Sequence, residues 1–182
     1  HLQGAQTYYN VESDLCTFGK AMANGFAVAA LAGKREIMEL GGILEEGKER
    51  IFLTSTTHGS EMSALGAFIK TIEILKRDQV ISHFWEYGKK LMDGMNQISS
   101  ELSMSEQFYV EGYPCSPNYM TKDLKGNLSL GFRTLFSQEL LKNGVMMPYI
   151  AISQSHGDKE LEITLNAVGE SLIVYQKALQ EG

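Results

Sequence analysis

The sequence predicts an α/β protein, because short apolar segments that end at glycines fill its first third and amphipathic helical patterns fill the remainder. The chain has 182 residues, 43% of them hydrophobic and 21% charged, which is the composition of a folded domain with its own core. No internal repeat or low-complexity segment interrupts these patterns. Because the pattern changes near residue 60, we expect a first domain over residues 1–60 and a second over residues 61–182.

In the first domain, residues 14–18 and 26–32 have the apolar character of buried strands. Residues 19–25 lie between them, are flanked by glycines and are too few for an ordinary helix, so they predict a turn. A short helix is expected at residues 34–40 and a third strand at residues 51–53.

In the second domain, apolar residues recur at helical spacing and predict long helices with one buried face each. The expected helices are residues 61–75, 80–102, 132–141 and 158–179. The expected strands are residues 108–110, 128–130 and 145–152. Ser60 and Asp158 are the expected N-caps of the first and last of these helices. These patterns therefore predict that the second domain is an α+β unit.

Charge and cysteine content exclude several classes of function. Sixteen Lys and Arg residues against 22 Asp and Glu residues give a net charge of -6, which offers no basic surface for nucleic acid. No apolar run reaches the roughly 18 residues that a membrane span needs, and no signal-peptide pattern opens the sequence, so we expect a cytoplasmic protein. Cys16 and Cys115 lack metal-ligand spacing, which predicts free thiols and no metal site. The start at His1 suggests a piece of a longer chain.

Lys20 is the first candidate for chemistry, because it follows a predicted buried strand and lies beside Gly19. A partly desolvated lysine loses its proton more easily and becomes a nucleophile that forms Schiff bases. An ordinary solvated lysine in a turn is the alternative interpretation of the same local sequence.

Residues 54–60 form a polar segment between a predicted strand and a predicted helix. Their hydroxyls and backbone N–H groups could bind a phosphate at a helix N-terminus, or the segment could be a loop that only caps the helix. His58 has no second His or carboxylate nearby at a metal spacing and reads as a loop residue.

The order of residues from Asp14 to Phe26, DLCTFGKAMANGF, resembles the cofactor-lysine segment of class III (fold-type I) pyridoxal-phosphate aminotransferases. The likeness is greatest to the glutamate-1-semialdehyde 2,1-aminomutase group. Residues 1–6, 140–145 and 153–156 also resemble parts of this family, so the likeness extends over essentially the whole chain.

The resemblance implies that Lys20 is the catalytic lysine, which holds pyridoxal 5'-phosphate as a Schiff base and later moves a proton. It also implies that Thr56 contacts the cofactor phosphate from the neighbouring subunit of a homodimer. By the same likeness, residues 1–60 are the C-terminal part of the large cofactor-binding domain and residues 61–182 are a linking helix with the small C-terminal domain. The implied substrate is a small amino or keto compound.

Several alternatives remain open at this stage. The family's phosphate loop, ring-stacking aromatic residue and pyridinium-pairing Asp belong to an upstream half that these 182 residues do not contain. The chain could therefore be part of an active enzyme or a non-catalytic α/β fragment that binds no cofactor alone. Aminotransferase and aminomutase activity are not separated by the sequence. Arg133 is a candidate clamp for a substrate carboxylate, or a surface helix residue.

Overall fold

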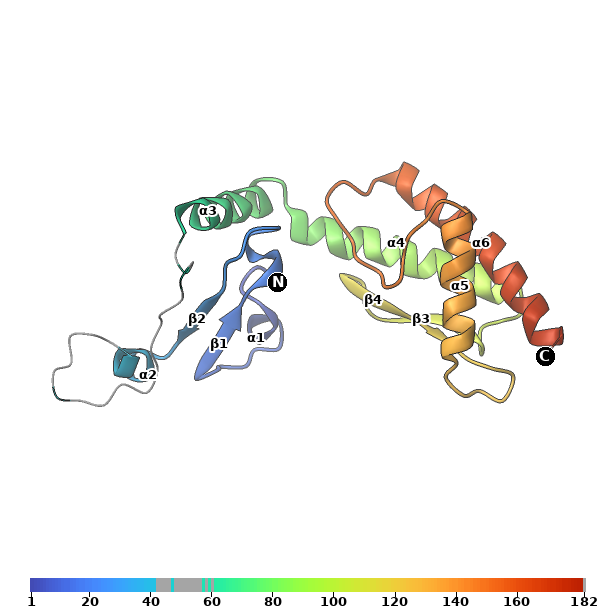
Figure 1. The fold of residues 1–182 in the computed structure, drawn as a ribbon, viewed down its shortest axis with the longest axis horizontal. Coiled ribbons are helices and arrows are strands. Elements are labelled where there is room, and N and C mark those ends of the chain that lie inside the picture. The colour runs from blue at the N-terminus through green and yellow to red at the C-terminus, as the bar shows by residue number, and fades with distance from the viewer. Residues whose placement is uncertain (42–46, 48–56, 58, 60, 182) are drawn as a thin grey trace. The chain divides into compact units, whose positions relative to one another are not determined.

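The computed structural model describes residues 1–41, 47, 57, 59 and 61–181, and Figure 1 shows its ribbon. The chain divides into two compact units, His1–Val80 and Ile81–Gly182. The predicted strand at residues 51–53, together with Thr56, His58 and Ser60, lies outside the described residues.

A two-stranded antiparallel sheet organises the first unit. Strands β1 (Leu15–Phe18) and β2 (Ala30–Gly33) pair in the register that places Leu15 opposite Gly33. Strands therefore form within both predicted segments, although β2 is shorter than the apolar run that predicted it. The prediction that they are buried is wrong for this chain, because their residues are exposed or half-buried. The turn between them contains the 3₁₀ helix η1 (Lys20–Met22).

Short helices complete the first unit around this sheet. They are α1 (Ala5–Tyr8), α2 (Arg35–Met38) and the 3₁₀ helix η2 (Glu39–Gly41). The predicted helix at residues 34–40 thus forms as an α-helical turn that tightens into a 3₁₀ turn.

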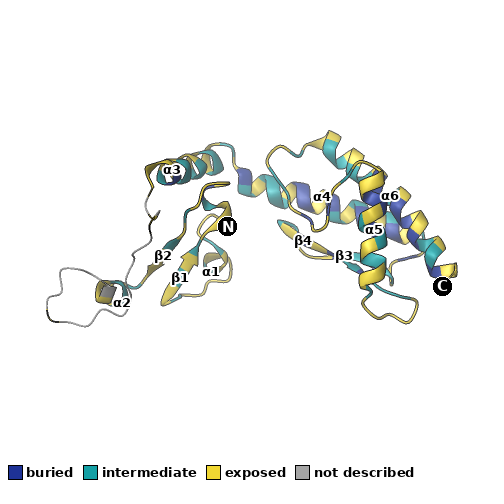
Figure 2. Cartoon of the chain, viewed as in Figure 1, coloured by how far each residue is buried: buried dark blue, intermediate teal, exposed yellow. Residues whose placement is uncertain are grey.

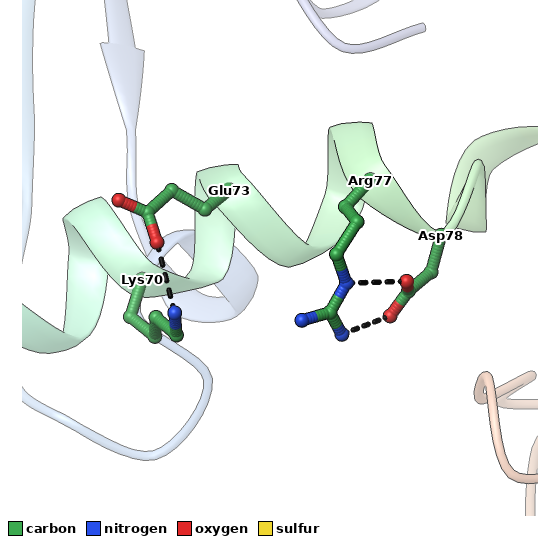
Figure 3. A network of polar contacts seen from close by, with 4 residues as sticks. All are labelled: Lys70, Glu73, Arg77 and Asp78. Carbon is green, nitrogen blue, oxygen red and sulfur yellow. Dashed lines mark hydrogen bonds and ion pairs between the residues drawn. The ribbon is translucent and has the colours of Figure 1, made fainter.

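Helix α3 (Met62–Arg77) confirms the helix predicted from residue 61, with Glu61 at the N-cap position. Figure 3 shows the polar contacts along its exposed side, where Lys70 pairs with Glu73 at 3.0 Å. At the C-terminal end, Arg77 donates from Nε and Nη2 to the two carboxylate oxygens of Asp78, at 2.6 Å each. Asp78 is the C-cap, so this forked ion pair forms where the helix stops.

The second unit packs three long helices against a β-hairpin. Its helices are α4 (Val80–Glu101), α5 (Leu130–Lys142) and α6 (Asp158–Glu181). The hairpin joins β3 (Phe108–Tyr113) to β4 (Ser116–Thr121) in antiparallel register. One apolar core runs through these elements, and its buried residues include Met95, Phe108, Tyr119, Phe136 and Leu172. Figure 2 shows the buried residues along the helices of this unit.

The predicted strand at residues 128–130 is wrong. Leu128 makes a single bridge to Lys122, and Ser129 is the N-cap of α5, where its side chain accepts a hydrogen bond from the Phe132 N–H at 3.2 Å. Strand β4 was not predicted, because Pro117 has no N–H to donate and is more typical of a turn than of a strand.

The predicted strand at residues 145–152 is also wrong, because these residues form an irregular connection from α5 to α6. Met147 and Ile150 are buried at 8% exposure each, and their spacing of three does not match the alternation of a strand. The Pro148 carbonyl accepts hydrogen bonds from the Tyr119 hydroxyl at 3.0 Å and from Arg133 Nη2 at 3.2 Å. Side chains, not a neighbouring strand, thus hold the segment.

The helices of the second unit begin and end within two residues of their predicted bounds. Within α4, a Cβ at Gly88 would collide with the Pro114 carbonyl oxygen of the hairpin turn, so this glycine marks a close packing contact. Asp158 is the first residue of α6 and not its cap. The Glu160 carboxylate accepts a hydrogen bond from the Gly157 N–H at 2.9 Å at this helix start.

Candidate functional site

The turn after β1 places Lys20 in an unusual backbone conformation. Lys20 has φ 51°, in the left-handed region that residues with a side chain rarely adopt, and it directly follows extended Gly19. Asn24 and Gly25 close the turn with φ 44° and 113°. A strand end and two left-handed positions therefore fix where the Lys20 side chain leaves the backbone.

Lys34 lies just after the partner strand and provides a comparison for Lys20. Its Nζ forms an ion pair with Asp14 at 2.7 Å, close to the point where the Lys34 N–H closes the hairpin on the Asp14 carbonyl at 3.0 Å. The hydrogen bond to Asp14 and its charge raise the pKa of Lys34, and the same contact lowers the pKa of Asp14. Lys34 is thereby held in its protonated form, which is not a nucleophile.

Lys20 is exposed, so the described residues do not provide the partial desolvation considered from the sequence. Its amine makes neither a hydrogen bond nor an ion pair with any residue that the structure describes. A primary amine that no other side chain holds can reach an aldehyde, with which its neutral form condenses. Of the two lysines at the ends of this hairpin, Lys20 is therefore the one available for covalent chemistry.

The sequence singled out Lys20 but missed the Asp14–Lys34 pair. Asp14 immediately precedes β1 and Lys34 immediately follows β2, so antiparallel pairing of these strands brings the two side chains together. The opposite charges at the outer ends of two predicted strands were the available signal.

The other predicted site residues have different outcomes. Thr56 lies outside the described residues, so its expected contact with a phosphate stays a prediction. Cys16 and Cys115 are free, half-buried thiols, as predicted. Within the described ranges, no group of three His, Cys, Asp or Glu side chains is arranged to hold a metal ion. No helix among these residues is long and apolar enough to cross a membrane.

Arg133 serves the fold and is not placed as a free carboxylate clamp. Its Nη1 donates to the Tyr119 carbonyl at 3.0 Å, its Nη2 donates to the Pro148 carbonyl, and its guanidinium lies 4.2 Å from the centre of the Tyr119 ring. These contacts tie α5 to β4 and to the connection before α6.

Comparison with known proteins gives one consistent family. The family model described as aminotransferase class-III matches residues 4–152. The chain is 36% identical over 181 residues to 3-aminobutyryl-CoA aminotransferase of Cloacimonas acidaminovorans (strain Evry), covering 98% of this chain and 42% of that relative. It is 29% identical over 178 residues to glutamate-1-semialdehyde 2,1-aminomutase of Alkaliphilus oremlandii (strain OhILAs), covering 93% and 40%.

Solved structures agree on the fold. One described as "Transaminase with PLP bound" superposes with a TM-score of 0.84 at 18% identity, over 97% of this chain and 42% of that one. An omega-transaminase from Sphaerobacter thermophilus gives a TM-score of 0.82 at 20% identity, over 95% and 41%. The chain thus spans less than half the length of the proteins it resembles.

These findings confirm the resemblance drawn from the Asp14–Phe26 segment and the predicted α/β fold as part of a transaminase. The matched residues include both the Lys20 turn and most of the second unit, and they amount to well over half of the chain. This chain belongs to the class-III aminotransferase family.

Proposed function

We propose that the protein containing this chain transfers amino groups with pyridoxal 5'-phosphate as its cofactor, as an aminotransferase or as an aminomutase. The observation that carries the proposal is Lys20, an exposed amine without a partner among the described residues, at a constrained position directly after β1. Relatives named for each activity, and a structural neighbour described with PLP bound, support both the reaction class and the cofactor.

The partners of the two hairpin lysines test whether the residues of this chain fit the cofactor, and they do fit it at Lys20. Pyridoxal 5'-phosphate presents an aldehyde, and the Lys20 amine has no carboxylate that would hold its proton, whereas the Lys34 amine has Asp14. Lys20 would hold the cofactor as a Schiff base, and the cofactor would supply the electron sink for bond breaking beside the amino group.

Lys20 would have a second role once a substrate amine takes its place. The freed Lys20 amine would then move a proton at the substrate carbon that bears the nitrogen, which is general acid–base work. The turn sets where this side chain starts, with φ 51° at Lys20, and its four-carbon stem would keep the released amine within reach of the reacting atoms.

Thr56 would hold the cofactor phosphate through its hydroxyl, from the neighbouring subunit of a homodimer. The resemblance of the segment before Gly59 to the family's phosphate-contacting loop supports this role. A hydroxyl beside the N-terminus of a helix is suited to a dianion, because the helix end presents free N–H groups.

The test is an assay of amino-group transfer on the full-length protein, with amine donors supplied together with keto acceptors. Lys20→Ala is expected to lower kcat by at least about 100-fold, because it removes both the cofactor link and the proton carrier. Lys34→Ala is the matched control, since it removes a lysine from the same hairpin, and it is expected to keep most of the activity. Equal losses in the two variants would contradict the role of Lys20.

Aminotransferase and aminomutase activity differ in the fate of the nitrogen. With a ¹⁵N-labelled donor, an aminotransferase passes the label to a second carbon skeleton, whereas an aminomutase returns it to the skeleton from which it came. The distribution of the label in the products decides between the two.

A further inference from the structure

The second unit contains a pocket of about 270 Å³, whose described lining residues all belong to that unit. Its walls come from α4, from the connection between α5 and α6, and from the start of α6, and Figure 1 shows that connection looping back beside α4. Leu91, Met147 and Ile150 give it an apolar lining. The volume lies near the lower end of the range of small-ligand pockets, which is about 300 Å³.

Tyr87 is a nearly buried residue of the pocket wall, and no described residue makes a hydrogen bond with its hydroxyl. The residue is only 6% exposed. Because the described residues leave no fully buried side-chain oxygen without a partner, the Tyr87 oxygen must reach open space. Burial raises the pKa of Tyr87, so the hydroxyl stays neutral at physiological pH.

Glu160 supplies the charge of the pocket. Among the lining residues that the structure describes, it is the only Asp, Glu, Lys or Arg. The hydrogen bond from the Gly157 N–H lowers the pKa of Glu160, which keeps the carboxylate ionised. That bond is made to Oε2.

The wall around His156 is held in a defined arrangement. His156 Nδ1 accepts a hydrogen bond from the Ser153 N–H at 3.3 Å, and the Ser153 carbonyl accepts one from His83 Nε2 at 3.2 Å. The His156 ring centre lies 5.6 Å from that of Tyr87. Two aromatic rings thus stand beside the carboxylate, which is the surrounding that favours an organic cation.

We propose that this pocket binds a small organic monoamine in its ammonium form. The ammonium group would donate to the Glu160 carboxylate and to the Tyr87 oxygen, and the apolar body would lie against Leu91, Met147 and Ile150. An organic anion would be repelled by the Glu160 carboxylate, and a neutral alcohol would forgo the charge-assisted hydrogen bond.

The test uses benzylamine as the probe on the whole chain, followed through the NMR signals of ¹³C-labelled Met and Ile methyl groups, without pyridoxal phosphate. Benzylamine is expected to shift the Met147 and Ile150 methyl signals saturably with a Kd on the order of 1 mM, because so small a ligand buries little surface. Benzyl alcohol is expected to bind at least about fivefold more weakly. Absence of saturable shifts, or equal binding of the alcohol, would overturn the proposal.

Variants distinguish benzylamine binding in the pocket from a general effect of protein charge on its Kd. Glu160→Gln is expected to weaken benzylamine binding at least about fivefold, because the amide carries no charge but still accepts from Gly157. Glu162→Gln removes the same charge from an exposed position on the same helix and is expected to leave the Kd unchanged. Tyr87→Phe keeps the ring and is expected to weaken binding about threefold through the lost hydrogen bond. Equal effects of Glu160→Gln and Glu162→Gln would overturn the assignment of Glu160.

Discussion

Lys20 and Lys34 lie at the two ends of one hairpin, and a single carboxylate distinguishes them. Asp14 holds Lys34 in its charged form, while Lys20 has no partner among the described residues. The local sequence around Lys20 leaves its role open, since most lysines are solvated. Within the folded hairpin, the Lys34 amine is held in an ion pair and the Lys20 amine is not, which leaves Lys20 the more accessible amine for an aldehyde.

Tyr175 gives a prediction for alkaline pH. Its side chain is fully buried and its hydroxyl donates to the Lys122 carbonyl at 2.7 Å, and burial raises the pKa of Tyr175 to about 12. The folded state therefore holds this proton more tightly than the unfolded chain, whose tyrosine pKa is about 10. The resulting stability is present in full below pH 10 and is lost as the pH rises from 10 towards 12.

The measurement for Tyr175 is the free energy of unfolding by urea at pH 8, 10 and 11. The wild-type value is expected to fall between pH 10 and 11 more steeply than that of Tyr175→Phe, which has no hydroxyl to ionise. The same pH dependence in both proteins would show that Tyr175 does not titrate as proposed.

Gly88 gives a prediction for packing. Gly88→Ala would push a Cβ into the Pro114 carbonyl oxygen, so we expect the free energy of unfolding to fall by about 1–3 kcal/mol. Gly169→Ala is the matched control on α6, because its Cβ would meet Ile98 at an ordinary 3.9 Å. Thermal unfolding of both variants checks this, and equal stability of the two would contradict the close contact at Gly88.

Among the elements, helix α4 both covers the core and hydrogen-bonds β3. Its side chains bind the backbone N–H and C=O groups on the edge of β3 that faces away from β4. Asn96 donates from Nδ2 to the Val110 carbonyl at 2.9 Å and accepts from the Val110 N–H at 2.7 Å. Ser99, also on α4, donates to the Phe108 carbonyl at 2.6 Å. A helix thus replaces a third strand along this edge.

Asn96→Ala is expected to lower the free energy of unfolding by about 2–4 kcal/mol, since it leaves both backbone groups of nearly buried Val110 without partners. Gln97→Ala, at an exposed position one residue along α4, is expected to change it by less than about 0.5 kcal/mol. Chemical denaturation measures both. A loss at Asn96 no larger than that at Gln97 would contradict the edge role of α4.

The long helices could be predicted from sequence and the irregular elements could not. Helices α3, α4 and α6 each carry one apolar stripe at helical spacing, so they could be recognised without the fold. Residues 145–152 are as apolar as a strand, but the Tyr119 and Arg133 contacts with Pro148 come from elements far away in sequence. Such contacts leave no local pattern.

On the scale of the whole molecule, the two units differ in how much apolar surface they bury. Only Ala23, Ala64 and Val80 are buried apolar residues among the described part of the first unit, whereas the second unit encloses a continuous core. Phe26 and Leu31 of the first unit are 52% and 41% exposed. Most of the hydrophobic stabilisation of the described chain therefore belongs to the second unit.

Residues 80–182, which start with α4, are accordingly expected to fold when produced alone. The expected result is a helical circular-dichroism spectrum, dispersed NMR signals and one cooperative thermal transition, because the core of this unit lies within these residues. A non-cooperative transition with poorly dispersed signals would show that this core needs the preceding residues.

In the candidate site, too, a feature could be predicted only where residues close together in sequence carry its signal. Lys20 could be recognised because its turn carries a characteristic order of residues, from Asp14 to Phe26. The Asp14–Lys34 pair depends on strand register, and the Tyr87 pocket depends on α4, α6 and the connection between α5 and α6 coming together. The chain spans 42% of the related 3-aminobutyryl-CoA aminotransferase, so the remaining cofactor contacts belong to a longer protein under our proposal.

The most direct test of the proposed role of Lys20 is covalent trapping of the cofactor. The full-length protein is incubated with pyridoxal 5'-phosphate, reduced with borohydride and digested, and the modified peptide is identified by mass spectrometry. We expect a pyridoxyl group on Lys20 and none above background on Lys34, whose amine is held by Asp14. A label on Lys34 equal to that on Lys20, or no label on Lys20, would contradict it.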